Sequence, residues 1–184
     1  MFAARRLLSA VLLAGAVLVA TGLPAVAVTA TATVTGGTLG WVTAPANTGF
    51  TVSLTGKDLV PTATQTFDVS DATGSGTGWN VTATSTTFTT GSKTLSPTSV
   101  TVQAVPAVAC DSGASCTSAT NGISYPYTLP AGATAPTATK IFGAAANTGL
   151  GNQTVTLVFS LAIPANTFAG SYSSTWTYSL VSAP

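Results

Sequence analysis

Apolar and polar residues alternate along most of the chain after residue 27. Successive side chains of a β-strand point to opposite faces, so strict alternation predicts strands with one buried and one solvated face. The clearest run is 154–163, where Val155, Leu157, Phe159 and Leu161 share one face. Shorter runs with the same pattern predict further strands at 28–35, 50–55, 67–69, 79–84, 100–104 and 171–180.

No segment has the period of about 3.6 residues that marks a long amphipathic helix. Threonine and valine are frequent in the alternating runs, and their branched side chains favour a pleated sheet. Many short strands without helices predict an all-β fold, an antiparallel β-sandwich of immunoglobulin-like architecture. We expect the runs 154–163 and 171–180 to pair as a hairpin through the turn at 164–167.

Residues 106–139 lack the regular alternation and contain several prolines. We interpret them as an irregular insertion in the sandwich, with short strands at most. The insertion holds Cys110 and Cys116, the chain's two cysteines, which we expect to form a disulfide in an exported protein. The alternative, a metal-binding pair, is disfavoured because the chain has no histidine.

The first residues have the features of a secretory signal peptide. Arg5 and Arg6 precede an apolar run at 7–19, and Ala25-Val26-Ala27 supplies the small residues that signal peptidase requires. We expect cleavage after Ala27, with a retained membrane anchor as the disfavoured alternative. The remaining residues, 28–184, fit one secreted domain that makes no membrane contact.

This predicted domain carries three lysines against four aspartates, so it has almost no net charge. Such a composition offers no basic patch for nucleic acid and no polybasic contact with a membrane. The surface must instead be covered by threonine, serine, asparagine and glycine. Electrostatic repulsion between copies is therefore weak, and self-association is less opposed than in ordinary secreted proteins.

The inventory of reactive side chains argues against an enzyme. The chain has neither histidine nor glutamate, and general acid–base catalysis needs a positioned pair of titratable groups. Asp68 and Asp71 lie close to the glycine-rich loop 73–78, where they fit turn caps better than calcium ligands. We therefore expect no catalytic site, no metal and no cofactor.

Two segments resemble the WxL domain family of Gram-positive surface proteins. The first is Gly78-Trp79-Asn80-Val81, with valine in the leucine position of the family's Trp-x-Leu motif. The second lies near the C-terminus, where Tyr178-Ser179-Leu180 takes the place of Trp-x-Leu and Trp176 falls two residues earlier on the same face. The turn at 164–167 and the ending at 180–184 also follow the family's pattern.

The resemblance implies a cell-surface protein that associates noncovalently with the cell wall by binding peptidoglycan, beside other surface proteins. Aromatic rings and neutral hydroxyl groups suit sugar recognition, and Trp41 is our candidate for an exposed aromatic side chain. The motif residues have two interpretations, because aromatic residues in phase with a strand face are more often core than ligand contacts. The residues in question are Trp79, Val81, Trp176, Tyr178 and Leu180.

Two other functions remain open at this stage. Strands rich in threonine and poor in charge suit subunits that assemble edge to edge into a surface layer or fibre. The domain could equally act as an adhesin for a protein partner, which the sequence does not distinguish from binding to the wall.

Overall fold

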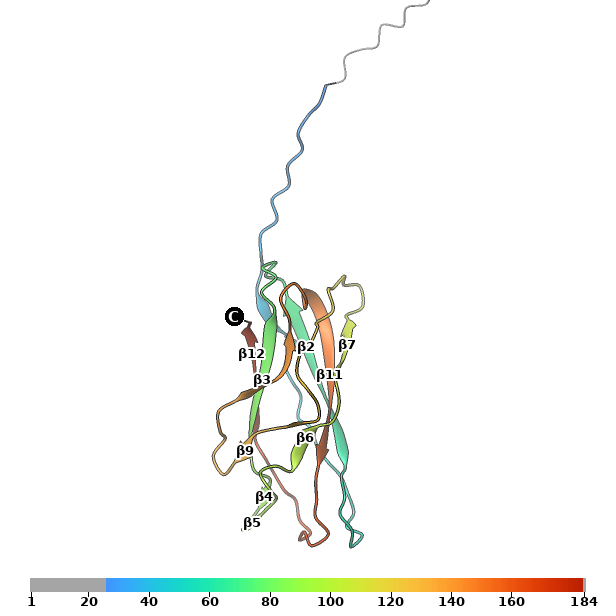
Figure 1. The fold of residues 1–184 in the computed structure, drawn as a ribbon, viewed down its shortest axis with the longest axis vertical. Coiled ribbons are helices and arrows are strands. Elements are labelled where there is room, and N and C mark those ends of the chain that lie inside the picture. The colour runs from blue at the N-terminus through green and yellow to red at the C-terminus, as the bar shows by residue number, and fades with distance from the viewer. Residues whose placement is uncertain (1–25, 184) are drawn as a thin grey trace, which may run out of the picture. The chain divides into compact units, whose positions relative to one another are not determined.

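The computed structural model describes residues 26–183, and most of the predicted signal peptide lies outside these residues (Figure 1). The chain divides into two units, Met1–Thr33 and Val34–Pro184. In the first unit, residues 26–33 form no strand and are fully exposed. The second unit contains all the strands, and the described residues contain no helix.

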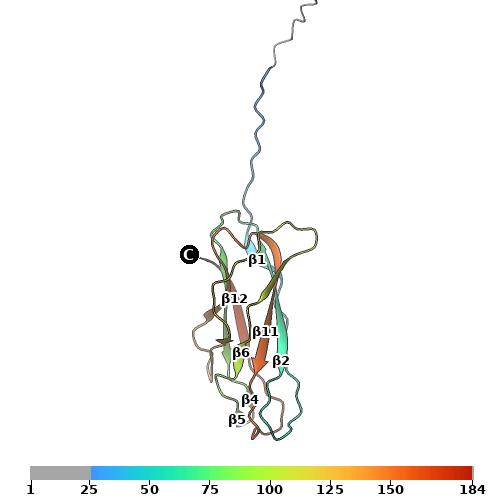
Figure 2. The same cartoon turned by 45° about the vertical axis from the view of Figure 1, so that its right-hand side comes forward.

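Two facing sheets form the second unit, as Figures 1 and 2 show. The larger has six strands in the order β1-β2-β11-β6-β8, with β7 also paired to β11. Adjacent strands in this order are all antiparallel. The strands are β1 (Leu39–Thr43), β2 (Thr62–Asp71), β6 (Val100–Val102), β7 (Ala107–Cys110), β8 (Tyr127–Thr128) and β11 (Gly151–Leu161).

The smaller sheet has the order β10-β3-β12, with the short β9 parallel to β3. Its edge strand β12 pairs with β3 along seven residues, and among the described residues no strand is hydrogen-bonded to the outer side of β12. A separate two-stranded ribbon joins β4 (Thr89–Thr90) and β5 (Lys93–Thr94). The strands of the smaller sheet are β3 (Trp79–Thr86), β9 (Ala131–Gly132), β10 (Thr139–Ala144) and β12 (Trp176–Ser182).

The core lies between the sheets and follows the alternation in the sequence. In β11 the alternate residues Val155, Leu157 and Phe159 are fully buried, and in β2 Phe67 and Val69 are fully buried. The smaller sheet contributes alternate buried residues from β3 to the same core. The sandwich that the sequence predicted is thus confirmed, because one face of each long strand is apolar.

The predicted hairpin between 154–163 and 171–180 is wrong. β11 pairs with β2 over ten residues in the larger sheet, whereas β12 pairs with β3 in the smaller one. The chain between them crosses from one sheet to the other. Both strands have one apolar face, which fits either pairing, so alternation alone does not decide which strands become neighbours.

Two other predicted strands are absent from the described structure. Residues 28–35 and 50–55 alternate as strands do, yet neither segment belongs to a sheet. Among the described residues, neither segment is hydrogen-bonded to a strand. The insertion at 106–139 matches its prediction better. It contains only the short strands β7, β8 and β9, of which the longest, β7, has four residues. The predicted disulfide between Cys110 and Cys116 is also formed.

Candidate functional site

The first motif belongs to the core. Trp79 and Val81 are fully buried in β3. The Trp79 indole donates a hydrogen bond from Nε1 to the carbonyl oxygen of Gly149 at 3.0 Å, and its ring lies 5.7 Å from that of Phe142. Gly149 has φ +79°, and a Cβ there would lie 2.6 Å from Nε1, so this contact requires glycine. Trp79 therefore has the burial and contacts of a core residue.

The second motif lies directly beside the first. In the ladder between β3 and β12, Leu180 is opposite Val81 and Ser182 is opposite Trp79. The two motifs, about a hundred residues apart in the chain, thus form neighbouring segments of one antiparallel pair. Trp176, Tyr178 and Leu180 are half-buried and pack against the core.

Trp41 is less exposed than we expected from the sequence. It lies in β1 opposite Val69, and its ring is 5.6 Å from that of Phe67. A register shift between Trp41 and Thr43 interrupts the ladder at this point. The ring covers the edge of the core and does not stand free in solvent.

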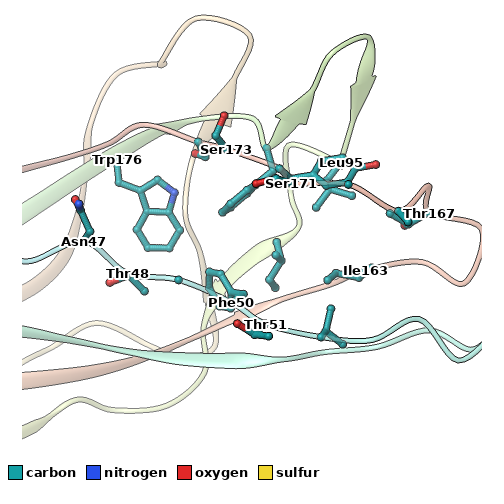
Figure 3. A pocket seen from close by; sticks show the side chains of 18 of the residues that line it. Asn47, Thr48, Phe50, Thr51, Leu95, Ile163, Thr167, Ser171, Ser173 and Trp176 are labelled. Atoms are coloured by element: carbon teal, nitrogen blue, oxygen red, sulfur yellow. The ribbon is translucent and has the colours of Figure 1, made fainter.

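A large open cleft lies beside Trp176, with a volume of about 960 Å³. One wall is the extended segment 45–54, which follows β1, and the other is the segment 167–174, which leads into β12. Figure 3 shows Phe50, from the first wall, and Trp176, the first residue of β12, extending into the space between the two walls. We call this site the aromatic cleft. Its size falls within the range of small-ligand sites, about 300–1,000 Å³.

The Trp176 ring is the centre of an aromatic cluster in this cleft. Its centroid lies 4.9 Å from that of Phe159 in the core and 6.3 Å from that of Phe50 across the cleft. The ring centroids of Phe88 and Tyr178 each lie 6.3 Å from the centroid of Trp176. Trp176 is thus fixed from behind by β11 while part of its ring stays accessible, as expected of a preorganised aromatic contact.

The polar groups of the aromatic cleft are neutral. None of its lining residues is charged, and the amide, hydroxyl and backbone groups of both walls supply its donors and acceptors. The buried Gln65 accepts a hydrogen bond from Thr48 Oγ1, which ties the wall 45–54 to β2. The phenol oxygen of Tyr178 is buried without a partner, and this burial raises the pKa of Tyr178 well above its ordinary value.

Neither wall has its full set of backbone hydrogen bonds. Among the described residues, the segment 45–54 makes no backbone-to-backbone hydrogen bond. In the opposite wall, 167–174, the backbone of Ser173 exchanges two hydrogen bonds with the backbone of Thr89, at 2.9 and 3.0 Å. The backbone N–H and C=O groups of the wall 45–54 thus have no backbone partner among the described residues.

The acidic residues form no second site. Asp71 Oδ1 accepts hydrogen bonds from the Thr73 backbone N–H at 3.0 Å and from Thr73 Oγ1 at 2.6 Å, so it caps the glycine-rich loop as predicted. Asp68 differs from its prediction, because its Oδ2 accepts a hydrogen bond from Thr43 Oγ1 in β1, at 2.9 Å. Within residues 26–183, no group of three or more His, Cys, Asp or Glu side chains could hold a metal ion. The same residues include no helix that is long and apolar enough to cross a membrane.

A comparison with protein families decides the identity of the chain. Residues 32–184 match the model described as WxL domain surface cell wall-binding. The chain belongs to the WxL domain family. No curated protein and no solved structure matches it. This WxL domain is therefore a surface domain of a family that binds cell walls, and the resemblance seen in its two motifs is confirmed.

The sequence indicated only part of the aromatic cleft of this WxL domain. Trp176 and Tyr178 stood out through the motif, but Phe50 and Phe88 did not, because nothing local links them to β12. The alternation at 50–55 carried a signal of its own. Residues 50–55 alternate as a strand does, yet they belong to no sheet, and residues 50–54 line the cleft.

Proposed function

We propose that this WxL domain is a secreted, non-catalytic module that holds peptidoglycan in the aromatic cleft. The observation that supports this most is the half-buried Trp176, fixed against Phe159 beside a cleft without charged side chains. One face of a sugar ring presents C–H groups that pack on an aromatic ring, while its hydroxyl groups need neutral donors and acceptors.

The neutral lining favours the sugar backbone of peptidoglycan over its peptides. No lining side chain of the cleft is charged, and the nearest cation, Lys93, lies over the rim residue Phe168 with its Nζ 4.2 Å from the ring centroid. A carboxylate bound beside Trp176, away from this rim, would lose water without gaining a cationic partner, which is costly. Sugar hydroxyl groups lose less, because Asn47, Thr48 and the free backbone groups of the wall can replace their water contacts.

We further propose that residues 1–27 are the signal peptide and that 28–184 form the mature domain. Export would bring the domain to the outer side of the membrane, where wall and oxidising conditions coexist. The disulfide between Cys110 and Cys116 supports an exported chain, since such bonds are rare in the cytosol.

Sedimentation with purified cell walls tests the cleft as the binding site. Phe168 is 61 % exposed at the rim of the cleft, so Phe168→Ser should leave the fold intact. Loss of one aromatic contact of about 1 kcal/mol should weaken retention about fivefold. Trp176→Ala, which removes the central ring, should weaken it further.

Each variant has a matched control outside the cleft. Val105 is 71 % exposed and is not part of the cleft lining, so Val105→Ser tests the loss of an exposed apolar side chain elsewhere. Trp41→Ala removes a half-buried tryptophan from β1. Equal retention of the Phe168→Ser and Val105→Ser variants, both at wild-type level, would exclude the aromatic cleft as the wall site.

A further inference from the structure

The aromatic cleft has the features of a sandwich that lacks one strand. Within its wall 45–54, the residues from Phe50 onward alternate as a strand but have no strand partner among the described residues, and Val52 and Leu54 remain 39 % and 41 % exposed. The opposite wall leads into β12, an edge strand with nothing paired to its outer side. A strand placed between these walls would meet unpaired backbone groups and would cover apolar side chains.

The same chain contains a strand-like segment without a sheet. Residues 28–35 alternate strictly, yet they are exposed, and among the described residues they make no backbone-to-backbone hydrogen bond. As a strand, these eight residues would extend about 27 Å. One face would carry Val28, Ala30, Ala32 and Val34, and the other would carry Thr29, Thr31, Thr33 and Thr35.

We propose that residues 28–35 of a second copy of this chain insert as a strand into the aromatic cleft. The small apolar side chains of one face would pack against Phe50, Phe88 and Trp176, which line the cleft. The threonine face would remain in solvent. No side chain of either segment is charged. The one charge of the donor segment is the α-amino group that cleavage after Ala27 would leave on Val28, at the end of the inserted strand, where it can stay in water.

The path of the chain favours a second copy over insertion into the same molecule. Residues 37 and 38 are fixed at the start of β1 by backbone hydrogen bonds with Ala72 at 2.7 and 3.1 Å. The cleft wall begins at Pro45, beyond the other end of β1. The donor segment thus joins the sandwich at one end of β1 and the cleft opens at the other.

This geometry makes the contact heterologous, because different surfaces of the two copies meet. When two copies join, one keeps a free cleft and the other keeps a free donor segment. The assembly therefore grows head to tail unless it closes into a ring. The inserted strand and a sugar chain cannot occupy the cleft together. Assembly and binding to the wall would therefore be alternative states of the same domain.

Sedimentation velocity of the secreted protein over a concentration series tests the proposal, with the N-terminus determined by mass spectrometry. The wild type should at least double its mass as concentration rises. Ala30→Asp combined with Ala32→Asp places two carboxylates on the face that enters the cleft, and this variant should remain monomeric. Thr31→Asp combined with Thr33→Asp adds the same charge to the same segment on its solvent face and should still assemble.

Both variants lie outside the sandwich, so their folding should be unaffected. A wild-type protein that stays monomeric at every concentration would overturn the proposal. This includes the case in which residues 28–35 fill the cleft of their own molecule. Equal loss of assembly in the two double variants would overturn it as well. Retention on walls is measured in parallel: if Ala30→Asp/Ala32→Asp abolishes assembly without raising retention, strand insertion stands and the proposed sugar site fails.

Discussion

At the scale of single residues, the two tryptophans of the family motif regions have different roles. Trp79 is fully buried with its indole N–H satisfied by Gly149, whereas Trp176 is half-buried at the wall of a cleft. The sequence places both in phase with apolar strand faces and so cannot separate them. The difference depends on neighbours from distant segments, such as Phe50 and Phe159, which only the folded chain brings close.

Trp79→Phe tests the architectural role of the first motif. The change leaves a cavity and an unpaired Gly149 carbonyl group, so the free energy of unfolding should fall by about 2–3 kcal/mol. Urea unfolding followed by circular dichroism measures this loss. Retention of the folded variant on cell walls should equal that of the wild type, and a selective loss of retention at unchanged stability would place Trp79 in the binding site instead.

Tyr178→Phe tests the cost of an unpartnered buried hydroxyl group. The phenol oxygen has no hydrogen bond, so its removal should keep or raise the free energy of unfolding, by up to about 1 kcal/mol. Burial raises the pKa of Tyr178 in the folded state above the unfolded value of about 10.

A pH series separates this effect from a change in packing. Above about pH 10 the unfolded state loses the phenol proton first, so the stability of the wild type should fall as pH rises. The Tyr178→Phe variant should lose less stability over the same interval. If the free energy of unfolding falls equally with alkaline pH in the wild type and in Tyr178→Phe, the Tyr178 phenol is not desolvated in the folded state.

At the scale of elements, the alternation of residues predicted the four longest strands, β2, β3, β11 and β12, but not their partners. β2, β3, β6, β11 and β12 each overlap a predicted run, because burial of one face requires the period of two. Pairing depends on contacts across the whole chain, which explains why the predicted hairpin of β11 and β12 was wrong. The segments 28–35 and 50–55 show a second limit, since a strand pattern forms a strand only where a partner is present.

The disulfide supports an element of its own, the short strand β7. Cys110 ends β7, which pairs with β11, and Cys116 lies six residues later. Replacing both cysteines by serine should lower the free energy of unfolding by about 2 kcal/mol through loop entropy. Thermal unfolding with and without reductant measures this change. Neither cysteine lines the aromatic cleft, so retention on walls should be unaffected, and a loss of retention in the folded variant would contradict the assignment of the cleft.

At the scale of the whole domain, the near absence of charge determines how it meets its partners. Attraction between charged groups weakens with salt, whereas packing on aromatic rings and neutral hydrogen bonds does not. The lining of the aromatic cleft has no charged side chain, so retention on walls should change little as salt is increased. Sedimentation over a salt series measures this. A steep decrease in retention would indicate binding through the few lysines rather than through the cleft.

The most direct test of the account observes the three tryptophan indoles themselves. In the two-dimensional ¹H–¹⁵N spectrum of the domain, Trp41, Trp79 and Trp176 each give one Nε1–H signal, which single substitutions assign. Addition of soluble peptidoglycan fragments should shift the Trp176 signal strongly and leave the buried Trp79 signal in place. If binding shifts the signal of Trp41 or Trp79 and leaves the Trp176 signal unchanged, the aromatic cleft is not the wall-binding site.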